Sequence, residues 1–263
     1  MLNYTVYKQG DDAEWVTFIH GAGGSSSIWY KQIREFSKHF NILLVDLRGH
    51  GKSKNHFHEK FKKYSFEKIG NDVVEVLEHL KISSTHFVGI SLGTIIIRDI
   101  TERFQHLSKS MILGGAVMKL NLRGQILMRL GATFKSVIPY LVLYRFFAFV
   151  IMPKKSHRES RNLFINEAKK LYQKEFKRWF TLIAQINPLL SFFRINDCGI
   201  PTLYVMGSED NMFLPSISKL VKNHPSSKLH VIPNCGHVVN VEQPELFNEK
   251  VIHFIKELNQ TAH

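Results

Sequence analysis

Cysteine and long apolar runs are both scarce in this sequence of 263 residues. The two cysteines, Cys198 and Cys235, do not have the spacing of a metal site, and a chain of this length needs no disulfide to fold. The longest apolar run, residues 137–152, falls short of the ~20 residues of a spanning helix, and Pro139 and Arg145 interrupt it. The first residues form neither a basic segment nor an apolar one, so no signal peptide is predicted. We expect a soluble, cytoplasmic protein.

Acidic residues are scarce in one part of the chain. Residues 116–196 contain 15 Lys and Arg but three Asp and Glu, a difference of +12, whereas the whole chain carries +13. This excess fits an anionic substrate, contact with an anionic membrane surface, or a solvated outer face. The basic residues accompany no recognisable nucleic-acid-binding motif, so we expect no nucleic-acid partner.

Short apolar runs alternate with helical patterns along most of the chain. Continuous runs of this kind are typical of strands buried on both faces. Residues 66–80 and 244–258 have apolar side chains at the three- and four-residue spacing of a helix face. The alternation predicts an α/β protein with a mostly parallel central β-sheet flanked by helices, and functional loops at the carboxyl ends of its strands. The predicted strands are 15–19, 41–46, 85–90, 109–116, 201–207 and 227–233.

Residues 117–196 break this alternation. They contain no clear strand, and Leu, Phe, Lys and Arg recur in them with helical spacing. We therefore predict that residues 1–116 and 197–263 form the α/β core and that residues 117–196 form a helical cap, or lid, inserted into it.

The sequence "GISLG" places Ser91 between Gly89 and Gly93. It follows a predicted strand and begins an apolar helix, which is the context of a nucleophile elbow. The sharp turn leaves no room for side chains at the two glycines, and it puts the serine hydroxyl at the positive end of the helix. The Leu92 N–H would then face a neighbouring oxyanion. The pattern alone also fits an ordinary serine at the start of a helix. Whether Ser91 is a nucleophile therefore depends on a base and an acid elsewhere in the chain.

A serine hydroxyl needs a base, and the base needs an acid to hold its ring. His237 follows the last predicted strand, so its loop lies at the edge of the sheet where Ser91 is expected. Asp210 follows the preceding strand with the spacing from Gly207 that is usual for the acid, and the adjacent Glu209 is its competitor. We interpret Cys235 as a packed loop thiol.

The sequence "HGAGGS", residues 20–25, is a glycine-rich loop after the first predicted strand. Its free backbone amides favour an oxyanion hole, with Ala22 N–H beside Leu92 N–H and Gly21 keeping the loop tight. The competing phosphate-loop interpretation fails, because no G-K-[ST] follows and the glycines do not form G-x-G-x-x-G. His20 is predicted to organise the loop without reacting.

Five segments in order resemble the α/β-hydrolase fold superfamily over nearly the whole chain. The order Ser91, Asp210, His237 is also the one used by that fold. The resemblance implies a Ser-His-Asp hydrolase with a helical cap between the family's sixth and seventh strands, and a structural role for Asp46 and His50, together with Arg48. The segments are "HGAGGS", "VDLRGHGKS", "GISLG", "GSED" and "CGHVVNVEQPE".

The expected reaction is hydrolysis of a small-molecule carboxylic ester with an apolar acyl part, through an acyl-enzyme and without a metal or cofactor. Serine at the elbow excludes the relatives that use aspartate there, the haloalkane dehalogenases and epoxide hydrolases. Thioesterases, C–C bond hydrolases, retro-ene lyases and cofactor-free peroxidases remain alternatives, as does a ligand receptor that keeps the triad. The oligomeric state stays open.

Overall fold

Seven strands form one sheet in the computed structural model, which describes residues 1–55, 64–119, 125, 131, 138–184 and 186–261. The strand order is β1-β3-β2-β4-β5-β6-β7, and every neighbouring pair is parallel except β1 with β3. The sheet confirms the predicted fold class. The strands are β1 Tyr4–Tyr7, β2 Trp15–Ile19, β3 Asn41–Val45, β4 Thr85–Ile90, β5 Ser108–Gly114, β6 Thr202–Gly207 and β7 Ser227–Ile232.

The six predicted strands are all present, but their burial differs. Strands β3, β4 and β6 are buried along their whole length, as a parallel strand covered on both faces should be. Strand β7 was expected to be buried in the same way and is only partly so, because it lies at the edge of the sheet. The antiparallel edge strand β1 was not predicted.

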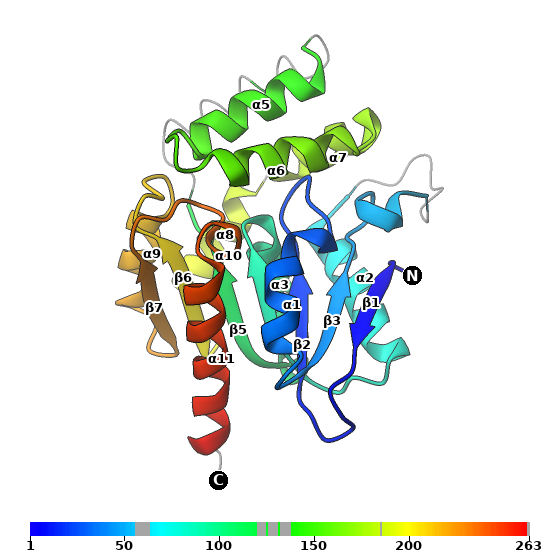
Figure 1. Cartoon of the computed structure of the whole chain (residues 1–263), viewed down its shortest axis with the longest axis vertical. Coiled ribbons are helices and arrows are strands. Elements are labelled where there is room, and N and C mark those ends of the chain that lie inside the picture. The colour runs from blue at the N-terminus through cyan, green and yellow to red at the C-terminus, as the bar shows by residue number, and fades with distance from the viewer. Residues whose placement is uncertain (56–63, 120–124, 126–130, 132–137, 185, 262–263) are drawn as a thin grey trace.

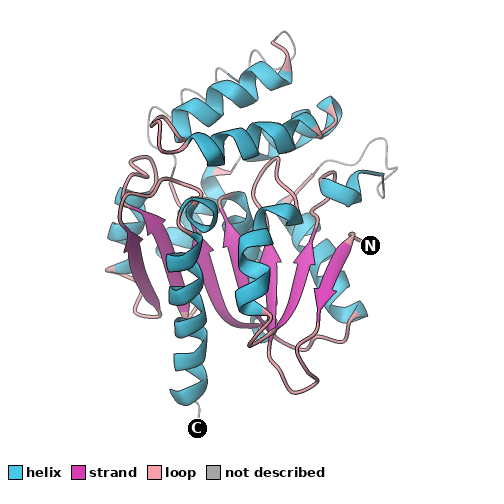
Figure 2. Cartoon of the chain, viewed as in Figure 1, coloured by secondary structure: helices cyan, strands magenta, loops and turns pink. Residues whose placement is uncertain are grey.

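Helices cover both faces of the sheet, in three layers that Figure 2 shows. Helices α2 (Phe66–His79), α3 (Leu92–Arg103), α8 (Asn187–Ile195) and α9 (Leu214–Val221) pack into one apolar cluster with one face. Helices α1 (Tyr30–Phe36), α10 (Val239–Glu242) and α11 (Pro244–Thr261) pack into a second cluster with the other. Short 3₁₀ helices span Ser26–Trp29, Gly51–Asn55 and Gln105–Leu107.

The predicted helix over 66–80 is α2, and its local sequence explains both its start and its packing. The Ser65 hydroxyl accepts a hydrogen bond from Lys68 N–H at 3.2 Å, which caps the first turn. Ile69, Val73 and Leu77 recur at four-residue spacing, and all three are buried against the sheet. The helix therefore lies with its apolar face on the core.

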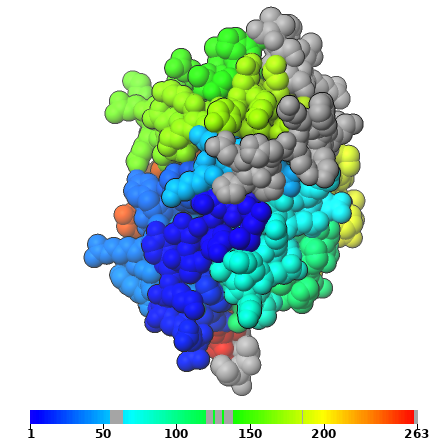
Figure 3. Space-filling view, turned by 90° about the vertical axis from the view of Figure 1, so that its right-hand side faces the viewer, coloured from blue at the N-terminus to red at the C-terminus, as the bar shows by residue number. Residues whose placement is uncertain are grey.

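Three more of the described helices lie above the carboxyl ends of the strands (Figure 1), and like α8 they fall between β5 and β6 in the chain. They are α5 (Tyr140–Ile151), α6 (Arg158–Lys169) and α7 (Gln173–Ala184), and they share a small apolar cluster of their own. The space-filling view shows the same helices stacked on the core (Figure 3). Within the predicted cap, residues 120–124, 126–130, 132–137 and 185 lie outside the described residues.

None of the helices in the described part of the chain has the length and apolarity needed to cross a membrane.

Candidate active site

Ser91 lies on a strained turn between β4 and α3. Its backbone angles are φ 54° and ψ −118°, a region that residues other than glycine rarely adopt. A Cβ at Gly89 would come within 2.5 Å of the Ile97 side chain, and one at Gly93 would press on the carbonyl oxygen of Ile19. The turn therefore needs glycine at both positions, for the steric reason expected from the sequence.

The structure brings Ser91, His237 and Asp210 into one hydrogen-bonded chain. His237 Nε2 lies 2.9 Å from Ser91 Oγ, and His237 Nδ1 lies 2.7 Å from Asp210 Oδ2. Ser91 follows β4, Asp210 follows β6 and His237 follows β7. The carboxyl ends of these strands meet at the same edge of the sheet. Because the carboxylate accepts from Nδ1–H, Nε2 is left free to accept the serine proton. This is the geometry of an activated nucleophile.

Asp210 is held in place and Glu209 points elsewhere. The second oxygen of Asp210 accepts a hydrogen bond from Phe213 N–H at 3.2 Å, and its side chain is fully buried. Glu209 instead pairs with Lys154 and His157, each at 2.8 Å. The Lys154 ammonium, followed by His157, lowers the pKa of Glu209. Of the two competing carboxylates, only Asp210 contacts His237.

The glycine-rich loop places two backbone amides beside the serine. Ala22 and Leu92 line the same cavity as Ser91 and His237. Within the part of the chain that the structure describes, neither amide donates a hydrogen bond. Two amides without acceptors beside a nucleophile can stabilise an oxyanion. The oxyanion hole at Ala22 and Leu92 stays a prediction, and both residues lie at the cavity where it would be needed.

Two buried histidines hold this loop against the loop after β3. His20 Nδ1–H donates to Gly21 O at 2.8 Å, while His20 Nε2 accepts from Leu47 N–H at 3.0 Å. His50 Nε2 accepts from Gly23 N–H at 3.0 Å, and its Nδ1–H donates to the Arg48 carbonyl at 3.1 Å. Each ring acts as acceptor at one nitrogen, so each is neutral.

Burial explains why both rings stay neutral. It lowers the pKa of His20, and it lowers the pKa of His50 to about 3, with the neighbouring His20 adding to the effect. The two ring centroids are 5.1 Å apart. In the described part of the chain, neither ring forms a hydrogen bond with Ser91, and the bonds of both rings go to loop backbone.

Asp46 and Arg48 also hold loops. The Asp46 carboxylate accepts the backbone N–H of Ser26 at 2.7 Å and of Lys52 at 2.9 Å. Arg48 forms a two-pronged ion pair with Asp72 on α2, at 2.8 and 2.7 Å. The charges of Asp46 and Arg48 are therefore both engaged in holding the loops beside Ser91.

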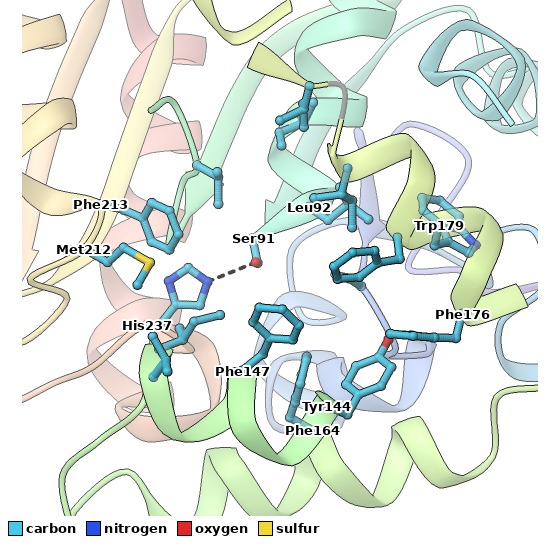
Figure 4. Close-up of a pocket in the computed structure, with 18 residues that line it drawn as sticks. Ser91, Leu92, Tyr144, Phe147, Phe164, Phe176, Trp179, Met212, Phe213 and His237 are labelled. Carbon is cyan, nitrogen blue, oxygen red and sulfur yellow. Dashed lines mark hydrogen bonds between the residues drawn. The ribbon is translucent and has the colours of Figure 1, made fainter. Parts of the chain in front are cut away.

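An apolar cavity of about 160 Å³ opens at Ser91 (Figure 4). Met212 and Phe213 stand beside His237, and Trp179 stands on the opposite side with Leu92. No Lys, Arg, Asp or Glu is among the lining residues, so the basic excess of residues 116–196 does not reach the described cavity. The lining is Ala22, Ser91, Leu92, Ile95, Val117, Tyr144, Phe147, Val150, Ile151, Phe164, Phe176, Trp179, Phe180, Ile183, Ile186, Met212, Phe213 and His237.

His157, at the start of α6, was not singled out from the sequence. Its ring is buried, and Nε2 lies 2.8 Å from Glu209 and 3.9 Å from Glu242. Glu242 in turn accepts the Gly236 N–H at 2.6 Å. Glu209 adjoins Asp210 and Gly236 adjoins His237 in the sequence, so these contacts link the start of α6 to both loops. No local motif marks His157, because its partners come together only in the fold.

Cys235 does not take part in this site. Its side chain is fully buried and lies outside the cavity lining, and burial raises the pKa of its thiol. A thiol kept protonated in this way is a poor nucleophile. Both cysteines are free.

The sequence model of the alpha/beta hydrolase fold matches residues 14–244. The chain belongs to the alpha/beta hydrolase fold family. The matched range includes the elbow and the loops with Asp210 and His237. This family membership agrees with the sheet order and with the place of the serine after β4.

Individual members are similar over almost their full length. A protein of Agrobacterium fabrum, provisionally named a carbamate hydrolase, is 26% identical over 99% of this chain and 100% of its own. The 3-oxoadipate enol-lactonase 2 of Acinetobacter baylyi is 26% identical, covering 98% of this chain and 94% of its own. The crystal structure of a hydrolase from Pseudomonas aeruginosa superposes with a TM-score of 0.82 at 19% identity, covering 97% of this chain and 94% of its own.

Proposed function

We propose that this protein is a serine hydrolase that cleaves carboxylic esters of small molecules with an apolar acyl part. The observation that carries the proposal is the chain of hydrogen bonds from Ser91 through His237 to Asp210, which ends in an apolar cavity. Relatives that are named for lactone and carboxylic-ester substrates support the same reaction class.

The geometry gives each group a role. Ser91 Oγ attacks the ester carbonyl carbon while His237 Nε2 takes its proton, and Asp210 stabilises the imidazolium that forms. The amides of Ala22 and Leu92 donate to the oxyanion of the tetrahedral intermediate. His237 then protonates the leaving alcohol, and the acyl group stays on the serine. Water, deprotonated by the same histidine, releases the acid and restores the enzyme.

The cavity sets the substrate class. Its lining is aromatic and aliphatic around three polar side chains, those of Ser91, Tyr144 and His237, with the Trp179 N–H turned to the Arg48 carbonyl. An anionic substrate group would be buried there without a cation, which is costly. We therefore favour a neutral, apolar acyl group over an anionic substrate. Residues 117–196, whose helices supply much of the lining, act as its cap.

Hydrolysis of p-nitrophenyl esters from acetyl to dodecanoyl tests the proposal. We expect kcat/KM to rise about fourfold per added methylene while the chain is being buried, and to fall once the cavity is full. Ser91→Ala should abolish turnover and labelling by a fluorophosphonate. A wild-type protein that neither turns over these esters nor accepts the label would refute the acyl-enzyme mechanism.

The same panel separates the alternatives. A thioesterase would prefer acyl thioesters over the matched oxygen esters. A C–C bond hydrolase or retro-ene lyase would leave both kinds of ester untouched, even where Ser91 accepts the fluorophosphonate label. A receptor would label at Ser91 and bind ligand, but it would release no more than one equivalent of p-nitrophenol per protein molecule.

We also propose that the outer face of α5 contacts an anionic membrane surface. Val142, Phe146 and Phe149 are exposed by 51, 50 and 54%, and their spacing puts them on one side of the helix with the exposed Arg145. Lys155 and Arg158 follow α5 in the chain, and both are exposed. Apolar side chains flanked by positive charge fit the interface of an anionic bilayer.

Sedimentation with phosphatidylglycerol and with phosphatidylcholine vesicles tests this contact. We expect binding to the anionic vesicles alone, weakened at high salt and by the double variant Phe146→Ser, Phe149→Ser. Tyr30→Ser removes an exposed aromatic ring from α1 instead and should bind like the wild type. Equal binding to both lipids would contradict the proposal.

A further inference from the structure

The hydroxyl of Tyr144 is an uncommitted polar group in the candidate active site. The side chain is 7% exposed and lines the cavity, and its oxygen makes no hydrogen bond within the described part of the chain. Burial raises the pKa of this hydroxyl, so it stays protonated. By contrast, Ser91, His237 and Trp179 all have hydrogen-bond partners. Tyr144 is therefore a donor in the cavity lining that has no acceptor among the described residues.

The position of this hydroxyl is set from two sides. A Cβ at Gly23 would lie 2.5 Å from Tyr144 Oη, so the side chain reaches from α5 to the glycine-rich loop next to Ala22. Its ring packs between Phe164 and Phe176, with centroids 5.1 and 5.2 Å away. Figure 4 shows the ring rising from α5 among the other lining residues. The donor is thus held in a defined place before any ligand binds.

Once a ligand displaces water from the cavity, a hydroxyl without a partner costs free energy that a phenyl ring of the same shape would not. That cost is avoided when the bound molecule itself supplies an acceptor. The acceptor has to be neutral, because the lining contains no charged side chain to accompany an anion. Carbonyl and ether oxygens meet this condition.

We propose that Tyr144 is a specificity-determining residue that donates a hydrogen bond to a second, neutral oxygen of the substrate. The substrate class is then an ester with an additional keto or ether oxygen beside the scissile bond. This inference rests on the proposed function, since it names the substrate of the same site.

Matched ester pairs test it with Tyr144→Phe. The pairs are p-nitrophenyl methoxyacetate with butanoate, and p-nitrophenyl 4-oxopentanoate with pentanoate. We expect kcat/KM to fall by about 5- to 30-fold for at least one oxygen-containing ester and by less than about twofold for its alkyl partner, the loss of one hydrogen bond. Tyr140→Phe is the control, because its hydroxyl donates to the Leu171 carbonyl outside the cavity lining. Tyr140→Phe should change kcat/KM by the same factor for both members of each pair.

Two outcomes would overturn the inference. If Tyr144→Phe lowers kcat equally for both members of each pair and leaves KM unchanged, the hydroxyl donates to the oxyanion of the intermediate and not to a second substrate oxygen. No loss on any ester would make it idle. Wild-type turnover of the alkyl esters that Ser91→Ala abolishes tests the proposed function separately. If the wild type hydrolyses none of them, the affinities for heptane-2,5-dione and heptan-2-one are compared instead. Tyr144→Phe should weaken binding of the dione alone. An equal change in affinity for the two ketones would refute the inference.

Discussion

Replacing His50 by glutamine should remove a defined part of the protein's acid sensitivity. The His50 ring is fully buried and neutral, with its Nε2 accepting from Gly23 N–H. Its pKa is about 3 in the folded chain, against 6.5 for an ordinary histidine. The unfolded chain therefore binds a proton that the folded chain refuses whenever the pH lies between these values. Stability is lost as the pH falls through this window.

The magnitude follows from linkage. Each pH unit below 6.5 costs about 1.4 kcal/mol of unfolding free energy per such group. Between pH 6.5 and 5.0 the His50 contribution is thus about 2 kcal/mol. A glutamine at this position has no proton to bind. His50→Gln should be less stable than the wild type at pH 7.5, and the gap should shrink by about 2 kcal/mol at pH 5.0.

Urea unfolding at the two pH values measures both gaps. Carboxylates that titrate in the same range are common to both proteins and cancel in the comparison. His106→Gln removes an exposed histidine and should show no such narrowing of its gap. A gap between wild type and His50→Gln that stays constant from pH 7.5 to 5.0 would refute the assignment of a buried neutral ring.

Two further predictions concern the elbow and the acid. Asp210→Asn should lower kcat by about 10³- to 10⁴-fold, because the His237 imidazolium loses its partner, whereas Glu209→Gln should lower kcat by less than about tenfold. Ester turnover measures both variants, and equal losses would contradict the assignment of Asp210 as the acid. Gly93→Ala should destabilise the fold by about 1–3 kcal/mol in urea unfolding, since its Cβ meets backbone oxygens, while Gly10→Ala, with open space around it, should stay within ~0.5 kcal/mol. A stable Gly93→Ala would show that the helix can move away from β2.

The buried parallel strands could be predicted because each is one continuous apolar run. Strand β4 is buried at every residue, so its sequence carries the signal by itself. Strand β1 has four residues, and Tyr4, Val6 and Tyr7 are at least partly exposed at the edge of the sheet. Such a strand is defined by its pairing with β3, which the local sequence does not record.

The candidate site divides in the same way. Ser91, Asp210 and His237 lie in the segments that follow β4, β6 and β7, and the carboxyl ends of parallel strands meet at one edge of the sheet, so the pattern of strands predicts that they come together. The choice between Asp210 and Glu209 depends on which side of one loop faces His237, a matter of tertiary packing. Tyr144 lies in α5 and His157 directly before α6, neither within a recognisable motif, and their partners are distant in the sequence. Neither could be recognised before the fold was known.

The buried contact between His157 and Glu209 has a consequence for protein engineering. Exchanging residues 117–196 with those of a relative is the obvious way to alter the substrate range. Such a graft brings a new α6 but leaves Glu209 and Glu242 in the recipient, next to the loops that hold the triad. Recombinants should therefore keep His157 or change both carboxylates with it, so the graft is not defined by the ends of the insertion alone.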